Sequence, residues 1–284
     1  MAGIITGNAI ALSLDGFSWL LFVGALLTAI SYQILSNFAN DYGDGMKGTG
    51  NDNRLGPKRI LQQNLLPPNV LFKGIVTMAL VALLLSLFLI LVAFGWTQLR
   101  SLLVFAGLAL AAIWAAYNYT VGDRAYGYFA LGDVFVFVFF GGVAVCGSYF
   151  LHEQTLSTTT YLLALAIGGL SVGVLNLNNL RDIENDRASN KRTIASLLGM
   201  HGGKIYHTIL VLGSLLALAQ GLKFAFLSAD TRYLPLIVTI PLLGQLGQLW
   251  RIADPREIDR LLKPLALTTF GLSLLLFVSF WMAQ

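Results

Sequence analysis

Charged residues and cysteine are both scarce in this sequence. Asp, Glu, Lys and Arg together make up 11% of the 284 residues, whereas 56% are hydrophobic. A soluble chain of this length needs far more charge to cover its surface, so the composition excludes that class. The one cysteine, Cys146, excludes a disulfide framework. No nucleic-acid-binding motif occurs in the sequence, and we expect no nucleic-acid partner.

Long apolar runs take the place of charge and indicate a chain that lies in membrane lipid. Backbone polar groups in lipid must be paired within their own segment, so we expect an all-α, polytopic bundle of transmembrane helices. The runs predict nine helices, at about 2–13, 17–38, 70–94, 99–120, 129–151, 160–180, 205–227, 232–250 and 265–282. The first run is too short to cross ~30 Å of hydrocarbon at ~1.5 Å per residue, so we expect a short or truncated first helix.

Basic residues are distributed unevenly between the loops. The loops at about 39–69, 121–128, 181–204 and 251–264, together with Lys73, hold 15 of the 18 Lys and Arg residues. The positive-inside rule places this side in the cytoplasm. We therefore expect a multi-pass protein of the bacterial cytoplasmic (inner) membrane, with these loops on the cytoplasmic side.

Two of these loops begin with acidic and amide side chains at helical spacing. The set after the second span is Asn37, Asn40, Asp41 and Asp44. The set after the sixth span is Asn178, Asp182 and Asp186. If the two helices continue into the loops, each set lies on one helix face and presents a strip of oxygen ligands.

These strips suit a hard cation that binds diphosphate. Mg²⁺ is held by one or two carboxylates and completes its shell with water and substrate phosphates. Carboxylates at this spacing repel one another unless a cation is present, and ionisable groups near a membrane interior are mostly functional. We therefore predict a Mg²⁺ site with these ligands: Asn40, Asp41, Asp44, Asp182 and Asp186. The alternative is that they are polar caps on helix ends.

Basic side chains follow each acidic set, as anionic phosphate oxygens require. With one amide they form the predicted substrate-binding set: Lys47, Arg54, Lys58, Arg59, Asn178, Arg187, Lys191 and Arg192. The alternative is that the basic residues are ordinary charges of positive-inside loops. The two acidic segments lie 138 residues apart. This spacing predicts a single domain over 1–284 with a possible internal repeat of about 1–128 and 129–284.

At these residues the sequence resembles the UbiA superfamily of intramembrane aromatic prenyltransferases. The first family motif, N-D-x-x-D-x-x-x-D, is matched from Asn40 to Asp44, and the second, D-x-x-x-D, from Asp182 to Asp186. The wider strings NDYGDGMKG, GPKR and NNLRDIENDR resemble the branch that prenylates 1,4-dihydroxy-2-naphthoate in menaquinone biosynthesis. Two positions depart from the pattern, because Gly48 replaces the third acidic residue of the first motif and Asn190 replaces a glycine after the second.

The resemblance implies nine helices around a central cavity that cytoplasmic loops cap. It implies a polyprenyl diphosphate and an aromatic acceptor as partners, membrane lipid around them, and catalytic roles for Asp44 and Asp182. A polyprenyl group would pass to 1,4-dihydroxy-2-naphthoate with loss of CO₂ and pyrophosphate, giving demethylmenaquinone.

A carbocation formed from the diphosphate needs aromatic faces near it. Candidates near the cytoplasmic ends of the fourth and fifth spans are Tyr117, Tyr119, Tyr126 and Tyr128, of which Tyr117 is the predicted catalytic residue. The alternative is that they form an interfacial tyrosine belt. Two other functions stay open for the chain: a prenyltransferase with another aromatic acceptor, such as 4-hydroxybenzoate, and a secondary transporter.

Overall fold

The computed structural model describes residues 1–13, 16–47, 60–61, 63, 65–225 and 229–283. Within them the chain is helical, and the described part contains no strand beyond one isolated bridge between Phe129 and Arg192. The helices are α1 Ala2–Leu12, α2 Trp19–Met46, α3 Pro68–Phe94, α4 Leu99–Asn118, η1 Tyr126–Tyr128, α5 Gly132–Val136, η2 Phe137–Gly147, α6 Ser148–Glu153, α7 Thr158–Arg181, α8 Ile183–Ala188, α9 Ile194–Phe224, α10 Ala229–Arg232, η3 Leu234–Val238, α11 Thr239–Arg251, η4 Pro255–Ile258 and α12 Asp259–Trp281.

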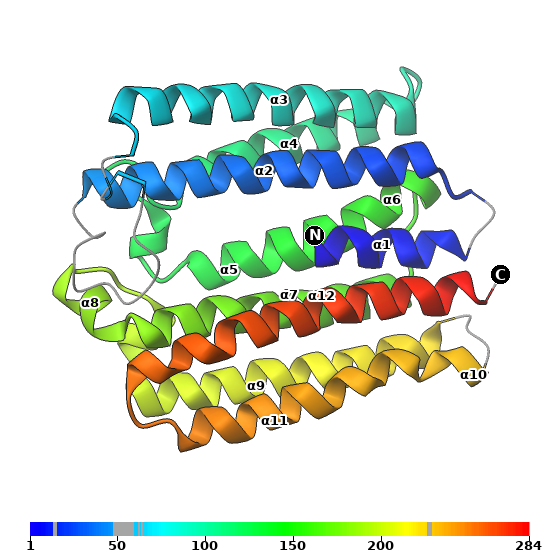
Figure 1. The fold of residues 1–284 in the computed structure, drawn as a ribbon. Helices are drawn as coiled ribbons and strands as arrows, with labels where there is room; N and C mark the ends of the chain where they lie inside the picture. The colour runs from blue at the N-terminus through cyan, green and yellow to red at the C-terminus, as the bar shows by residue number, and fades with distance from the viewer. Residues whose placement is uncertain (14–15, 48–59, 62, 64, 226–228, 284) are drawn as a thin grey trace.

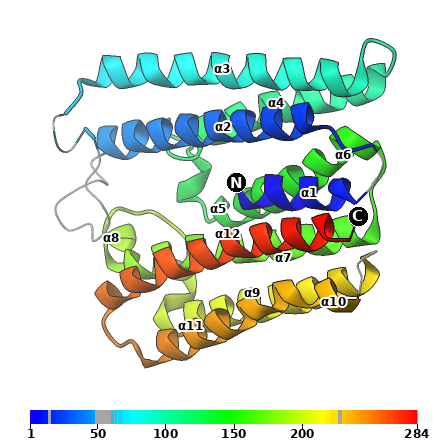
Figure 2. The ribbon, with the colours of Figure 1, turned by 45° about the vertical axis from the view of Figure 1, so that its right-hand side comes forward.

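The long helices run side by side along one axis (Figure 1). Helix α2 packs on α3 and α4, and α7 packs on α9, η2 and α12. The short α1 lies between them, against α12 and η2. In both ribbon views α3 and α9–α11 form opposite outer layers, while α5 and α7 lie inside (Figures 1 and 2).

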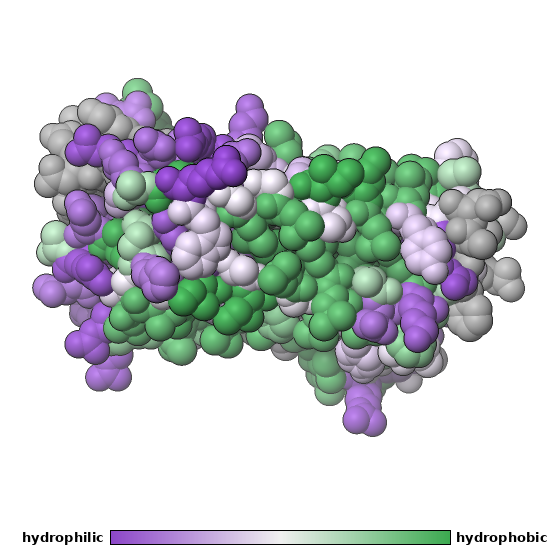
Figure 3. Space-filling model, turned by 90° about the horizontal axis from the view of Figure 1, so that it is seen from below, coloured by the Kyte–Doolittle hydropathy of each residue, from purple (hydrophilic) through white to green (hydrophobic). Residues whose placement is uncertain are grey.

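In the part of the chain that the structure describes, seven helical segments are long and apolar enough to cross a membrane. They include α3, whose exposed Leu80 and Leu84 present an apolar outer face. In Figure 3 apolar residues cover the middle of the visible face, and hydrophilic residues gather toward its two ends. The chain is therefore a multi-pass membrane protein. The described parts of the loops rich in Lys and Arg lie at the end of the bundle that carries α8, which we call the α8 end (Figure 1).

Each of the nine predicted ranges contains helix, but several boundaries differ. Helix α2 continues to Met46 rather than ending near residue 38, so the first acidic set is helical as expected. Helix α9 begins at Ile194 rather than near 205, because Thr193 and Ser196 form a capping box, and it is kinked at Gly199, whose φ is +73°. The range 129–151 contains the π-helix η2, and 232–250 is divided between α10, η3 and α11.

Small residues allow the helices to approach closely, as their spacing indicates. An added Cβ on Gly7 would lie 2.3 Å from the Val145 carbonyl oxygen, and one on Gly169 would lie 2.3 Å from Ser214 Oγ. Gly43, inside the first acidic motif, also allows a close approach. An added Cβ there would lie 2.5 Å from Thr120 Oγ1 and 2.6 Å from the Thr120 carbonyl carbon. The motif glycine therefore sets how closely the end of α2 approaches the residue that follows α4.

Gly43→Ala is expected to push these two segments apart. The new methyl meets backbone rather than a flexible side chain, so overpacking should lower stability by about 1–3 kcal/mol. A thermal midpoint measured on detergent-solubilised protein tests this. Gly107→Ala is the matched control, because nothing lies within 4 Å of an added Cβ there and alanine is the better helix former. Equal midpoints for the two variants would contradict the packing role of Gly43.

Candidate functional site

The first acidic set lies on the last turns of α2, at the α8 end of the bundle. Asp44 is buried and accepts a hydrogen bond from the Tyr128 hydroxyl at 3.3 Å. Thr120 donates its hydroxyl to the Ala39 carbonyl at 3.0 Å and lies 3.3 Å from Asn40 Oδ1. Contacts from the α4–α5 connection thus hold the first set in place.

The second acidic set does not form one uninterrupted helical strip. Helix α7 ends at Arg181, and Asp182 has φ −95° and ψ 14° before α8 begins. The prediction of a continuing helix is therefore wrong at this point. The Asp186 amide still donates to the Asp182 carbonyl at 2.8 Å, so both carboxylates stay close in sequence and structure. Both are buried, at 5% and 4% exposure.

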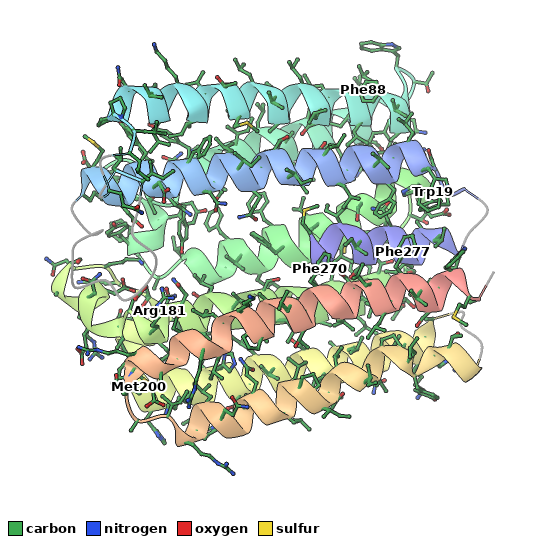
Figure 4. All side chains as sticks on the ribbon, in the orientation of Figure 1. Trp19, Phe88, Arg181, Met200, Phe270 and Phe277 are labelled. Carbon is green, nitrogen blue, oxygen red and sulfur yellow. The ribbon has the colours of Figure 1, made fainter. Side chains whose placement is uncertain are left out.

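Arg181 organises this break, and the sequence analysis assigned it no role. Its guanidinium donates to both carboxylate oxygens of Asp182, at 3.1 and 2.7 Å. It also donates to Asn178 Oδ1 at 2.7 Å and to Asp259 Oδ1, at the start of α12, at 2.5 Å. Arg181 itself is 3% exposed and lies where α7 and α12 meet (Figure 4). Asn178 and Asp182 therefore face an arginine in this structure.

Asp186 carries the least satisfied carboxylate of the pair. Its Oδ1 forms an ion pair with Lys191 Nζ at 3.2 Å, whereas its Oδ2 is buried without a hydrogen-bond partner. Burial raises the pKa of Asp186, Lys191 opposes this, and repulsion from Asp182 and Asp44 adds to it. The acidic ends of α2 and α7–α8 both lie at the α8 end of the bundle (Figure 1).

Three of the predicted phosphate-binding residues have partners in the structure. Lys191 pairs with Asp186, and Lys47 Nζ lies 4.1 Å from the centre of the Tyr128 ring. Burial lowers the pKa of Lys47, and Asp44 and Asp123 oppose that change. Arg187 instead donates to the Ser196 carbonyl on α9, at 3.2 and 2.9 Å.

The other basic residues of the predicted substrate-binding set are either exposed or lie outside the described residues. Arg192 is exposed and pairs through its backbone with the segment before α5. Arg54, Lys58 and Arg59, with the departure at Gly48, lie outside the described residues. The other departure from the family motif is Asn190 in place of a glycine. The backbone accommodates it, because Asn190 has φ +54° and asparagine tolerates the left-handed region better than most residues.

The described residues can be tested against the chemistry of Mg²⁺. In the described ranges no three Asp, Glu, His or Cys side chains come together as a complete metal site. Mg²⁺ does not need one, because it takes one or two carboxylates and fills its shell with water and phosphate. The oxygens of Asn40, Asp41 and Asp44 lie on one strip, and Asp186 Oδ2 is a buried oxygen without a partner. The donor set therefore fits this ion.

An apolar cavity of about 410 Å³ begins beside these residues. Asn37 and Asn40 line one part of it, and Ile4, Leu89 and Leu151 line another. Its walls come from α1, α2, α3, α4, η1, α5, η2, α6 and α7. Among the described lining residues no side chain is an Asp, Glu, His, Lys or Arg. The cavity is thus a largely apolar space whose polar part includes a predicted metal ligand.

Aromatic rings form part of this wall. The Tyr126 ring stacks on Phe135 with centroids 3.9 Å apart and on Trp114 at 5.9 Å, and Tyr119 meets it edge-on at 5.4 Å. The Tyr126 hydroxyl donates to the Ala115 carbonyl at 2.8 Å, which fixes the ring. Tyr119, Tyr126 and Phe135 all line the cavity.

Tyr117, the predicted catalytic tyrosine, lies elsewhere. It lines a separate groove of about 240 Å³ formed by α2, α3 and α4, with Phe72 and Ile113. The reason is helical geometry, because residues two apart on a helix point to different faces and Tyr119 takes the cavity side. Its position therefore gives no support to a role at the cavity.

Two features of the site were missed from sequence. Arg181 could have been found, because an arginine in the last turn of an apolar span normally has a partner. Asp259 could not, because its neighbours in sequence look like an ordinary polar loop. The pairing of Arg181 with Asp259 becomes visible only when α7 and α12 are placed side by side.

Comparisons with known proteins agree with the fold and the motifs. The UbiA prenyltransferase family profile matches residues 1–275. A 1,4-dihydroxy-2-naphthoate octaprenyltransferase of Haemophilus influenzae is 43% identical over 249 residues, which cover 86% of this chain and 79% of the relative. One of Escherichia coli K12 is 39% identical over 287 residues, which cover 99% of this chain and 92% of the relative.

Two solved structures share the fold at low identity. A UbiA homologue from Aeropyrum pernix K1 superposes with a TM-score of 0.68 at 13% identity, covering 97% of this chain and 96% of that one. A structure described as a digeranylgeranylglyceryl phosphate synthase in membranes gives 0.65 at 16% identity, covering 99% and 92%. With a profile match over nearly the whole chain and close curated relatives, this chain belongs to the UbiA prenyltransferase family.

Proposed function

We propose that this membrane enzyme transfers a polyprenyl group from polyprenyl diphosphate to 1,4-dihydroxy-2-naphthoate, with release of pyrophosphate and CO₂. One observation carries the proposal: Asn40 belongs both to the acidic end of α2 and to the wall of the apolar cavity. A diphosphate at the acidic ends would therefore continue directly into a space suited to an isoprenoid chain. The curated relatives support the naphthoate acceptor by their names.

The polar end of the cavity would hold the diphosphate. Asn40, Asp41, Asp44, Asp182 and Asp186 are the residues that would hold Mg²⁺, and Lys47 and Lys191 add positive charge nearby. Bound Mg²⁺ would neutralise the diphosphate and stabilise it as a leaving group. Placing these groups at the α8 end, which the positive-inside rule assigns to the cytoplasm of a bacterial inner membrane, gives a charged substrate access from water.

The cavity wall would control the cation that forms when the allylic C–O bond breaks and its electron pair leaves with pyrophosphate. An apolar wall excludes water, which would otherwise capture the cation. The fixed rings of Tyr126 and Tyr119 offer negative faces without a nucleophilic charge. The naphthoate ring carbon that carries the carboxylate then forms the new C–C bond.

The next bond to break is the one between this ring carbon and its carboxylate. Its electron pair returns to the ring as CO₂ leaves, so no proton has to be removed from the carbon attacked. An acceptor such as 4-hydroxybenzoate loses a ring proton instead and needs a base. The described cavity walls carry no acidic or histidine side chain, which favours the decarboxylating acceptor.

Product analysis tests the proposal. Purified protein receives one polyprenyl diphosphate, Mg²⁺ and either 1,4-dihydroxy-2-naphthoate or 4-hydroxybenzoate. We expect a prenylated naphthoquinol skeleton one CO₂ lighter than the simple adduct, together with pyrophosphate, only with the first acceptor. A carboxylated adduct, product from the second acceptor alone, or uptake into proteoliposomes without chemistry would overturn it.

Asp44→Ala and Asp182→Asn are expected to abolish prenyl transfer, by at least about 100-fold in kcat, while the protein still inserts. Mass spectrometry of product at several Mg²⁺ concentrations measures this. Asp259→Asn is the matched control, because Asp259 shares Arg181 with Asp182 but its side chain is 60% exposed. If Asp182 serves only to pair with Arg181, the two Asn variants will behave alike and its metal role is wrong.

Tyr126→Leu is expected to lower kcat about 10-fold, because it removes a ring face worth about 1–2 kcal/mol to a nearby desolvated cation. Tyr126→Phe keeps the ring and loses only the bond to Ala115, so its kcat should stay near that of the parent. Steady-state kinetics at saturating substrates distinguishes them. Equal loss in both variants would show that the hydroxyl, and not the ring, matters.

A further inference from the structure

Tyr128 contacts the end of the first acidic set and the segment that follows the second one. Its hydroxyl donates to Asp44 Oδ1 at 3.3 Å, on the last turn of α2. Its backbone carbonyl accepts a hydrogen bond from the Arg192 amide at 3.2 Å, in the segment that follows α8. Lys47 Nζ lies 4.1 Å above its ring. One residue of the short η1 segment therefore lies between two parts of the chain that are far apart in sequence.

The attachment to the second segment is a double one. Besides the bond to Tyr128, the Ala130 amide donates to the Arg192 carbonyl at 2.9 Å, which completes the bridge with Phe129. Two residues before Arg192, Asn190 turns the chain with φ +54°, and Thr193 then starts α9. The loop from Asp186 to Thr193 is thus fixed to η1 through backbone groups, whose positions do not depend on a side-chain rotamer.

We propose that Tyr128 is a positioning residue that holds the Asp44 carboxylate in the orientation needed for cation binding. The inference rests on the proposed function, because it assumes that Asp44 is a Mg²⁺ ligand. Carboxylates that bind metals are themselves held by hydrogen bonds from outer partners, which fix the orientation of the ligand. The hydrogen bond from the Tyr128 hydroxyl holds Oδ1 of Asp44 in place. Because the carboxylate is rigid, this bond also restricts where Oδ2 can point. The Tyr128 ring places Lys47 beside the same carboxylate.

The test measures cation binding directly, with Mn²⁺ alone as the probe and no substrate present. Electron paramagnetic resonance of free Mn²⁺ gives the dissociation constant for the purified full chain in detergent. We expect Tyr128→Phe to weaken Mn²⁺ binding about 10-fold, because outer-partner loss commonly costs that much. Its kcat at saturating Mg²⁺ should stay within a few-fold of the parent, while the Mg²⁺ concentration for half-maximal activity rises in parallel.

Tyr161→Phe is the matched control. It makes the same chemical change at an exposed tyrosine at the start of α7, at the opposite end from the acidic segments, and should leave the Mn²⁺ dissociation constant unchanged. A thermal midpoint of Tyr128→Phe without metal should lie close to that of the parent, which separates positioning from general loss of structure.

A double-mutant cycle tests whether Tyr128 acts through Asp44. If it does, Tyr128→Phe should weaken Mn²⁺ binding in the parent but not in an Asp44→Asn background. Equal 10-fold losses in both backgrounds, or no loss in the parent, would overturn the positioning role while the proposed function stands. A parent that binds no Mn²⁺ at all, with or without pyrophosphate, would instead contradict the metal site itself and the inference with it.

Discussion

Repulsion between buried carboxylates at the α8 end of the bundle is the constraint on which the rest of the site depends. Asp44, Asp182 and Asp186 are all less than a tenth exposed, and charge that has left water must be compensated by partners. The structure supplies a different partner to each: a tyrosine hydroxyl to Asp44, an arginine to Asp182 and a lysine to Asp186. One oxygen of Asp186 is still without a hydrogen bond. This unpaired oxygen supports the proposal that the site binds a cation.

These partners also connect parts of the chain that are far apart in sequence. Arg181 joins α7 to α12 through Asp259, and Tyr128 joins the end of α2 to the loop before α9. Gly43 has no side chain, and this lets the end of α2 approach Thr120 closely. The same contacts that balance charge thus fix the distance between the acidic ends. A diphosphate with bound cations has a set size, so this distance decides whether both ends engage it together.

Much of this could be predicted from the sequence, and the remainder has physical reasons. Apolar runs located all nine helical regions, and loop charge sorted the connections correctly to one end, because both signals are local in sequence. Helix ends were less certain, since polar residues continue α2 to Met46 and a capping box starts α9 at Ile194. Tyr117 was assigned without knowing which face of α4 meets the cavity. The Arg181–Asp259 pair joins residues 78 apart, and no sequence periodicity links them.

The site has a charged part at the α8 end and an apolar part in the cavity, and the proposed chemistry needs both. Charge is needed where pyrophosphate leaves, but a carboxylate or free amine beside the allylic cation would capture the cation or remove a proton from it. The described cavity wall accordingly carries no Asp, Glu, His, Lys or Arg side chain, while the buried carboxylates of Asp44, Asp182 and Asp186 lie at the α8 end. An acceptor that loses CO₂ carries its own leaving group on the attacked carbon. Such an acceptor can react inside this cavity without a base. The apolar cavity and the decarboxylating acceptor are therefore compatible, because the acceptor needs no base and the cavity offers none.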